Sequence, residues 1–381
     1  MSIIESTADN NSMYAYVQEG ERAAYELGNR GPIRFDSDGS LHEGILDAYW
    51  RCGFYVFEDV LSSDELKEIQ DDFEHVLERA PYTKDAELDP NGRSAIGNEF
   101  KRYPFKFSRP LSDPLGGTSK NNGRHPSKMT EHEPPAGGPD FVISSVFGPL
   151  QLMDSALRLY GHPKLLALAE QINGPDFTPF NETIINKPAG LGVSVAWHQD
   201  GTKQWDHPNW DQGTHGFNFM IQLYGSTAAN GVWVLPGSHK NGQIDISEKV
   251  AANQGSDRLP GAVPMVCEPG GIVMANRQTL HGSFANTSPD RRVTINMGFH
   301  RRDSVLGVET NYYGEPAVYD NTFIHERSRM IAVGIDARQQ KFPEEERFVY
   351  KPMVGLEEKN RWNEETRESI VKDYNMRDLG I

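Results

Sequence analysis

A histidine and an aspartate, His198 and Asp200, lie two positions apart in the sequence, a spacing at which their side chains can act together. The surrounding residues favour a β-strand, and in an extended strand residues i and i+2 point to the same face. An imidazole and a carboxylate that project into one space are two ligands that a strand end can offer to a metal ion. Taken alone this is a weak signal, because His-x-Asp is a short and common pattern.

A third candidate ligand, His281, lies at the far end of a β-rich run that begins after a tight glycine turn. The next β-rich run brings Arg292 to one face, together with Thr294 and Asn296 at a period of two. Two imidazoles and one carboxylate leave other positions of a metal open, as in non-haem Fe(II) oxygenases. A bidentate 2-oxo acid can fill two of these positions and O₂ the third. Arginine is the residue type suited to holding the distal carboxylate of such an acid.

These candidate residues lie in a region, 178–302, of short β-rich runs separated by Gly, Pro and Asn. Such a pattern predicts an antiparallel sandwich or barrel, and therefore a protein that is mainly β with flanking helices. The expected strands are 183–186, 193–197, 217–224, 232–235, 263–266, 272–275 and 293–299.

Helical and irregular sequence flanks this predicted core on both sides. We expect a single catalytic domain over 1–381, with an N-terminal helical and loop region at 1–177 and a C-terminal helical wrapping at 303–381. Residues 81–140 lack periodicity and are rich in Gly and Pro turns, and a loop of this length predicts a lid. Outside the core, the expected elements are helices at 14–27, 150–160, 163–171 and 362–374, a helix that opens with a capping box at Ser62, and a strand at 54–57.

The composition excludes several classes of protein. Among 381 residues, 38 Lys and Arg stand against 54 Asp and Glu, so the net charge is −16. This balance argues against a nucleic-acid binder, because phosphate contacts need clustered Lys and Arg, and equally against docking on anionic lipid. No apolar run approaches the ~18 residues of a membrane helix, and the N-terminus lacks a signal-peptide pattern. Only Cys52 and Cys267 occur, so the expected location is the reducing cytoplasm.

A basic and aromatic segment, 100–109, stands out within this acidic chain and lies inside the predicted lid. One interpretation is that it recruits an anionic or aromatic substrate through charge or cation–π contacts. The other is a solvated loop whose aromatic rings pack on the core. The sequence leaves both interpretations open.

The segments around the candidate residues resemble the phytanoyl-CoA dioxygenase family of Fe(II)/2-oxoglutarate-dependent oxygenases. The resemblance implies a double-stranded β-helix, a cupin-like jelly roll, which agrees with the strand pattern. The matching segments are Ile185-Asn186-Lys187-Pro188, Trp197-His198-Gln199-Asp200, Asn230-Gly231-Val232-Trp233-Val234-Leu235-Pro236-Gly237-Ser238-His239, Pro269-Gly270-Gly271, His281-Gly282-Ser283, Asn286 and Arg292.

The same resemblance implies a role for individual residues. Three of them would bind Fe(II) and form the catalytic centre: His198, Asp200 and His281. Arg292 would hold the distal carboxylate of 2-oxoglutarate. Lys187 and Ser283 match positions that help to hold this co-substrate in some relatives.

We therefore expect an Fe(II)/2-oxoglutarate-dependent dioxygenase that hydroxylates a C–H bond of a small organic substrate and releases succinate and CO₂. Because Asp200 is present, hydroxylation is favoured over halogenation, for which related enzymes typically carry a small residue at this position. Five alternatives remain: desaturation, cyclisation or halogenation at the same iron site, a non-catalytic jelly roll that binds a ligand, and zinc-dependent hydrolysis. The sequence identifies neither the substrate nor the oligomeric state, for which a homodimer is one option.

Overall fold

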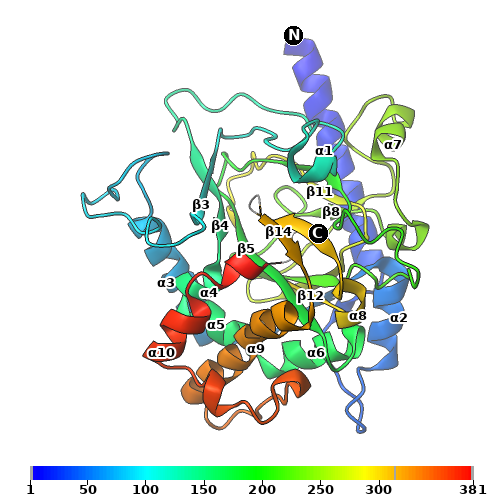
Figure 1. Ribbon diagram of the computed structural model, residues 1–381. Helices are drawn as coiled ribbons and strands as arrows, with labels where there is room; N and C mark the ends of the chain where they lie inside the picture. Colours follow the sequence, from blue (N-terminus) through cyan, green and yellow to red (C-terminus); the bar gives the residue numbers. More distant parts are fainter. Residues whose placement is uncertain (1–2, 313–314, 379–381) are drawn as a thin grey trace.

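The computed structural model describes residues 3–312 and 315–378, in which two β-sheets stack to form the core (Figure 1). The larger sheet has eight strands in the order β1-β2-β10-β7-β12-β5-β4-β3, and the smaller has four in the order β6-β11-β8-β9. Neighbouring strands are antiparallel except for the pair β1 and β2. The predicted double-stranded β-helix is confirmed, and each of the predicted strands overlaps an observed one.

The bounds of the strands are as follows. The larger sheet contains β1 (Arg30–Gly31), β2 (Phe54–Phe57), β3 (Phe105–Ser108), β4 (Val142–Phe147), β5 (Thr178–Lys187), β7 (Phe217–Gln222), β10 (Ile272–Asn276) and β12 (Arg292–His300). The smaller sheet contains β6 (Val195–His198), β8 (Trp233–Val234), β9 (Val263–Pro264) and β11 (His281–Ser283). A separate hairpin joins β13 (Glu309–Tyr312) and β14 (Glu315–Val318).

Alternation along the larger sheet sorts its side chains onto two faces. In β7, Phe217 and Ile221 belong to the main hydrophobic core, whereas Asn218 between them faces the space between the sheets. In β12, Val293 and Ile295 also belong to the main hydrophobic core, whereas the alternate residues Arg292, Thr294 and Asn296 face the space between the sheets. The inner face of the sheet therefore carries polar side chains that can form a binding site, while the outer face is packed in the hydrophobic core.

Helices provide that cover. The helices α2 (Glu43–Cys52), α3 (Ser63–Arg79), α5 (Asp154–Tyr160), α6 (Pro163–Asn173) and α9 (Asn321–Lys341) share one buried core with the larger sheet. In Figure 1, α5, α6 and α9 gather in the lower part of the molecule, beneath the strands. Short helices complete the chain: α4 (Pro149–Leu152), α7 (Ile246–Ala252), α8 (Arg302–Val305) and α10 (Glu364–Thr366).

The smaller sheet is covered by the N-terminal helix α1 (Ile3–Glu26), whose first turns project beyond the sheets in Figure 1. Tyr16 stacks on Trp233 of β8 with ring centroids 4.6 Å apart. Gly20 is buried one turn further along, and a Cβ atom there would lie 2.4 Å from the Trp233 ring. The helix can approach the sheet this closely only because position 20 has no side chain.

The sheet extends into the predicted N-terminal region, because β1, β2, β3 and β4 all precede residue 178. Strand β3 lies within the predicted lid, and its pairing with β4 ties part of that segment to the core. Local sequence patterns did not indicate these edge strands, apart from 54–57.

Two helix predictions are wrong in extent. The predicted helix at 150–160 is divided into α4 and α5 at Met153, whose backbone is extended. The predicted helix at 362–374 forms over a shorter range, as α10 followed directly by a π-helical turn at Arg367–Val371. It stops because Lys372 is extended and Asp373 adopts φ of 59°, with its backbone N–H donated to Gln151.

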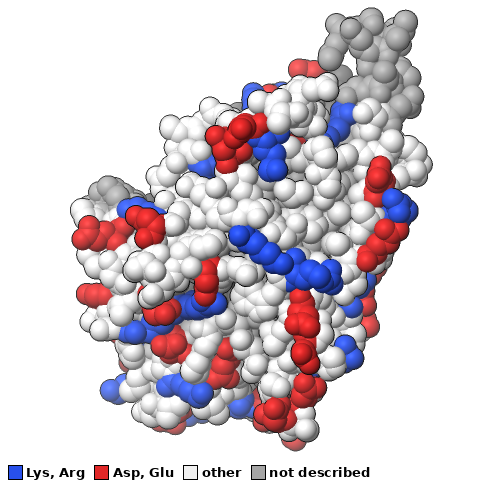
Figure 2. Space-filling view, turned by 90° about the vertical axis from the view of Figure 1, so that its right-hand side faces the viewer, with Lys and Arg blue, Asp and Glu red and all other residues white. Residues whose placement is uncertain are grey.

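No helix within 3–312 and 315–378 is long and apolar enough to span a membrane. Although the net charge is −16, the surface carries side chains of both signs (Figure 2). On the face in Figure 2, a diagonal row of Lys and Arg lies beside a column of Asp and Glu. The two signs of charge are therefore intermixed on that face.

Candidate metal centre

The three predicted metal ligands lie together in the structure. The candidate ligand atoms of His198, Asp200 and His281 all lie within 4.8 Å of one another, and all three residues are buried. Strands β6 and β11 are antiparallel neighbours that set His198 opposite His281, with ring centroids 4.1 Å apart. Asp200 follows β6, and its Oδ1 lies 3.6 Å from Nε2 of His198.

His281 reaches this position by a route that differs from the expected one. The run after the glycine turn was expected to be a strand that presents His281 at its far end. Instead, β10 ends at Asn276 in the larger sheet, and the chain then crosses to the smaller sheet, where His281 begins β11. The crossing is what places the second histidine beside the first.

Hydrogen bonds fix which nitrogen of each imidazole can bind a metal. Nδ1 of His198 lies 2.8 Å from the carbonyl of Ala196, and Nδ1 of His281 lies 2.8 Å from that of Thr279. A carbonyl oxygen only accepts, so each Nδ1 carries a proton and each Nε2 has a free lone pair. Burial, and then the neighbouring His281, hold the pKa of His198 well below its usual range, which keeps this ring neutral.

The carboxylate of Asp200 is also oriented by its neighbours. Oδ2 accepts a hydrogen bond from Nδ2 of Asn218 at 3.0 Å and lies 3.5 Å from Nε of Arg277. Oδ1 is the oxygen that faces His198. Burial raises the pKa of Asp200, but the charges of Arg124 and Arg277 outweigh it and hold the pKa well below its usual range. Two imidazole nitrogens and one carboxylate oxygen are a donor set that fits Fe(II).

Arg292 lies across from this cluster on the larger sheet. It is 2% exposed, and its Nε and one terminal nitrogen have no hydrogen-bond partner among the described residues. Burial lowers the pKa of Arg292 to about 10, so it stays charged at neutral pH. Its neighbour Arg291 points outward and pairs with Glu74 at 2.6 Å, as expected for two successive residues of a strand. A buried guanidinium with unpaired N–H groups is suited to binding a carboxylate.

Lys187 and Ser283 lie next to this arginine. In the sheet, Lys187 of β5 is the register partner of Arg292. Its ammonium donates to Oγ of Ser283 at 2.8 Å and to the carbonyl of Phe284. Ser283 lines the cavity described next, whereas Lys187 lies behind it. Burial, and then the charge of Arg292, hold the pKa of Lys187 well below its usual range.

A cavity of about 340 Å³ between the two sheets joins these groups. Its walls include the three candidate metal ligands and the inward-facing residues of β12, which are Arg292, Thr294 and Asn296, as their period of two predicts. The aromatic rings of Phe147 and Phe180 also line it. The candidate ligands are thus open on one side to a space that can hold small molecules.

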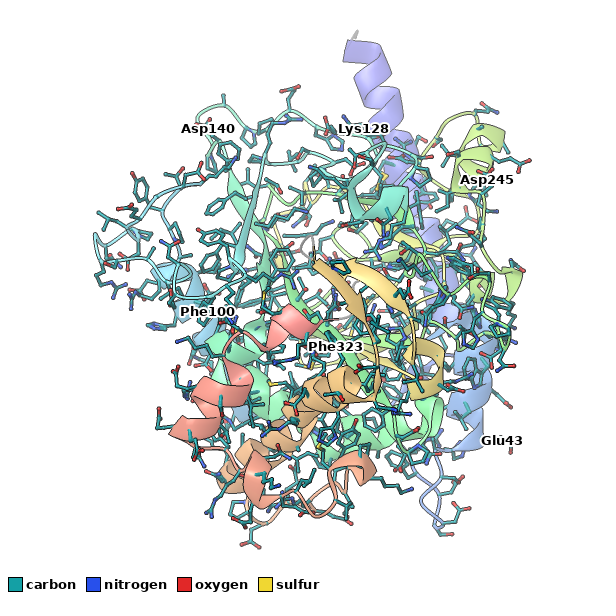
Figure 3. The ribbon with its side chains drawn as sticks, viewed as in Figure 1. Glu43, Phe100, Lys128, Asp140, Asp245 and Phe323 are labelled. Atoms are coloured by element: carbon teal, nitrogen blue, oxygen red, sulfur yellow. The ribbon has the colours of Figure 1, made fainter. Side chains whose placement is uncertain are left out.

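Two functional candidates in the long segment 81–140 were not predicted. Arg124 places a terminal nitrogen 3.1 Å from Oδ1 of Asp200, and the ring of His125 lies 4.3 Å from that of His198. His125 is buried, and neither ring nitrogen has a hydrogen-bond partner among the described residues. In Figure 3, Lys128 and Asp140 mark the course of this segment along the upper side of the molecule. The segment has no periodicity, so no pattern in the sequence marks either residue.

Asn218 and Arg277 were also missed, but the sequence contains signals for them. Asn218 and Gln222 are the polar residues of an otherwise apolar run, and alternation places Asn218 on the inner face of β7. Arg277 immediately follows β10, and its backbone carbonyl accepts a hydrogen bond from the N–H of Asp200 at 2.8 Å. An isolated polar residue in a core strand is a sign of a site.

A jelly-roll sandwich that groups two histidines and one carboxylate beside a cavity defines the class of non-haem iron oxygenases. The sequence model of the family described as phytanoyl-CoA dioxygenase (PhyH) matches residues 49–294. The chain therefore belongs to the phytanoyl-CoA dioxygenase family, and it is an enzyme of the Fe(II)/2-oxoglutarate-dependent dioxygenase type. Its cofactors are iron and 2-oxoglutarate, and its substrate is a small molecule.

Individual relatives are distant. The chain is 26% identical over 289 residues to an ectoine dioxygenase of Halomonas elongata, covering 71% of this chain and 73% of the relative. It is 22% identical over 283 residues to a phytanoyl-CoA dioxygenase of Arabidopsis thaliana, covering 72% and 94%. A crystal structure of EctD from S. alaskensis with 2-oxoglutarate and 5-hydroxyectoine has 19% identity and a TM-score of 0.47, covering 73% of this chain and 82% of that one.

Proposed function

We propose that the protein hydroxylates a C–H bond of a small organic substrate while 2-oxoglutarate is converted to succinate and CO₂. The observation that carries this proposal is a single cavity lined by a buried His/Asp/His cluster and by the unpaired guanidinium of Arg292. A cluster with only a structural role would not need both a His/Asp/His set and an unpaired guanidinium in the same cavity. Phytanoyl-CoA and ectoine are the compounds named for the relatives, and both are compounds to be assayed with this chain.

The residues divide the work between them. Iron with 2-oxoglutarate and O₂ supplies the oxidising power that breaks the C–H bond. His198, Asp200 and His281 would hold the metal through Nε2, Oδ1 and Nε2, and the hydrogen bonds to Nδ1 and Oδ2 keep these atoms aimed at it. The walls of the cavity exclude bulk water and keep the substrate near the metal.

The co-substrate would lie between the metal ligands and the larger sheet. Arg292 would pair with its distal carboxylate, and Ser283 would donate a hydrogen bond to it. Lys187 would act as a positioning residue, since its ammonium already bonds to Ser283 and holds that hydroxyl in place.

The test replaces single ligands. In His198→Ala and Asp200→Ala we expect substrate-dependent succinate formation to fall at least a thousandfold, because two remaining ligands bind iron weakly. The visible absorption band of the anaerobic Fe(II)–2-oxoglutarate complex should disappear in both variants. His75→Ala, which removes an exposed histidine on α3, is the control. Turnover that survives in either ligand variant would contradict the assignment.

The alternatives remain separable by experiment. Product mass distinguishes hydroxylation, which adds one oxygen, from desaturation or cyclisation, which removes two hydrogens, and from halogenation. Absence of the absorption band in the unmodified protein would favour a non-catalytic binding protein. A cytoplasmic location and a homodimer stay proposals; the two cysteines, both free and buried, support the first.

A further inference from the structure

The basic segment 100–109 divides into cations that face solvent and two that line the cavity. Lys101 is exposed, and Arg109 is exposed and pairs with Glu131 at 3.0 Å. Lys106 lines the cavity that contains the candidate metal ligands. Of the segment's cationic residues, Arg102 also lines it.

The position of Lys106 follows from strand β3. Phe105 is buried in the main hydrophobic core and Phe107 packs against it, so the rings of this strand serve the fold. Lys106 between them is the register partner of Ser145 in β4, and the register shifts after Lys106. Ser144 and Ser145 line the same cavity, so hydroxyl groups accompany the ammonium.

Apart from Arg292, which would bind the co-substrate, Lys106 differs from the other cations of the cavity because its ammonium has no partner. Arg102 pairs with Asp378 at 3.1 Å, and Arg124 pairs with Asp200. No hydrogen bond or ion pair of the Lys106 ammonium exists within the described residues, and burial, then Lys120, lower its pKa. A half-buried cation without a counter-ion is costly unless a ligand supplies one.

The charge balance of the loaded cavity indicates what that ligand must carry. Asp200 is the one carboxylate among the described residues that line the cavity. The two negative charges of 2-oxoglutarate offset the two positive charges of Fe(II), and Asp200 and Asp378 offset Arg124 and Arg102. Arg292 and Lys106 then leave the loaded cavity with an excess of positive charge. Because Arg292 would already contact the co-substrate, Lys106 is the cation that remains for an anionic group of the primary substrate.

The size of the cavity limits the ligand further. A volume of about 340 Å³ is near the lower end for a pocket that holds one ligand, yet this cavity must hold 2-oxoglutarate as well. The remaining space suits a compact metabolite and excludes a long acyl chain enclosed within it.

We propose that the primary substrate is a small carboxylic acid whose carboxylate pairs with Lys106 while its reacting carbon faces the iron. This inference rests on the proposed function, since it places the substrate in the cavity of the iron centre. Phe147 and Phe180 supply the apolar wall against which the carbon skeleton packs.

The experiment compares small carboxylic acids with their primary amides, which match them in shape but lack the charge. The panel consists of cyclic and linear amino acids and hydroxy acids, each with its amide. Binding is read from the change each compound causes in the absorption band of the anaerobic Fe(II)–2-oxoglutarate enzyme, and turnover from succinate formation. We expect at least one acid to bind about 10- to 100-fold more tightly than its amide, as for a hydrogen bond to a charged group.

Variants assign that preference to Lys106. Lys106→Met should remove the preference for the acid while binding of the amide changes little, and Lys106→Arg should restore part of it. Lys101→Met removes the same side chain from an exposed position of the same segment and should keep the full preference. A misfolded variant would lose the acid and the amide alike, so the ratio separates recognition from stability.

Two results would overturn the proposal and a third concerns the proposed function. Acids that bind no better than amides, or a preference that persists in Lys106→Met, would each show that Lys106 does not recognise the substrate. If the unmodified enzyme forms no iron–2-oxoglutarate band, the proposed function itself fails, and both proposals fall with it.

Discussion

At the scale of single residues, neighbours of the same type have opposite roles because a strand alternates its faces. Arg291 pairs with an acid on the surface, whereas Arg292 is buried with unpaired N–H groups in the cavity. Only the orientation of the strand distinguishes them. This pair therefore offers a matched comparison.

We predict that Arg292→Met raises the KM for 2-oxoglutarate about 10- to 100-fold, because one charged hydrogen-bonded pair is lost from a buried site. The kcat should fall less, since the metal ligands are unchanged. Steady-state kinetics with varied 2-oxoglutarate measure both values. Arg291→Met should leave KM within about twofold; equal effects in the two variants would return Arg292 to a structural role.

The metal cluster could be predicted from the sequence because its residues follow short, local patterns. His198 and Asp200 share a strand end, and Arg292 has inward neighbours at a period of two. Arg124 and His125 could not be predicted, because they reach the cluster from a segment without periodicity. Their position depends on the path of the whole segment, which no window of the sequence encodes.

At the scale of elements, the core strands were predicted and the edges of the larger sheet were mostly not. Strands such as β7 and β12 carry a clear alternation because one face is covered by helices and the other lines the cavity. Strand β3 is short, contains a register shift and has a neighbour on one side only. Its pairing with β4 is a long-range contact, so its own residues carry little evidence of it.

The contact between α1 and β8 gives a prediction at this scale. Gly20→Val should lower the free energy of unfolding by about 2 kcal/mol, because its side chain would overlap the Trp233 ring and force α1 outward. A thermal melt measures the loss, and limited proteolysis should then cleave within α1. Glu19→Val introduces the same residue at an exposed position of the helix and should have a small effect. Equal stability of the two variants would show that α1 is not held against Trp233.

At the scale of the whole molecule, the site spans the two sheets. The histidine ligands come from strands of the smaller sheet, and Arg292 comes from the larger one. A co-substrate that binds the metal and Arg292 at once would link the sheets.

We therefore predict that 2-oxoglutarate stabilises the fold only when both anchors are present. Under anaerobic conditions with Fe(II), saturating 2-oxoglutarate should raise Tm by a few degrees, because a ligand at about 100 times its Kd adds about 2.7 kcal/mol. Calorimetry should find this increment absent without metal and absent in Arg292→Met, while the increment from the metal alone persists in that variant. An undiminished increment in Arg292→Met would mean that the co-substrate does not reach the larger sheet.

The C-terminal region shows how apolar residues near the end of the chain are used. Ile370, Val371 and Tyr374 are all buried in the main core. Asp378 is buried as well and accepts hydrogen bonds from Arg327 and Arg102. These side chains serve packing within one chain, so they are not available as an interface between two chains.

The origin of the cavity walls has a consequence for how this enzyme can diversify. The iron ligands and Arg292 come from 195–292, whereas Lys106, Ser144 and Ser145 come from strands that precede residue 178. The groups proposed for oxygen chemistry and those proposed for substrate choice thus lie mainly in separate stretches of the chain, although Arg124 from the N-terminal stretch contacts Asp200. If the proposals hold, changes confined to the strands before residue 178 can alter which compound is oxidised while the residues proposed to bind iron and 2-oxoglutarate stay the same.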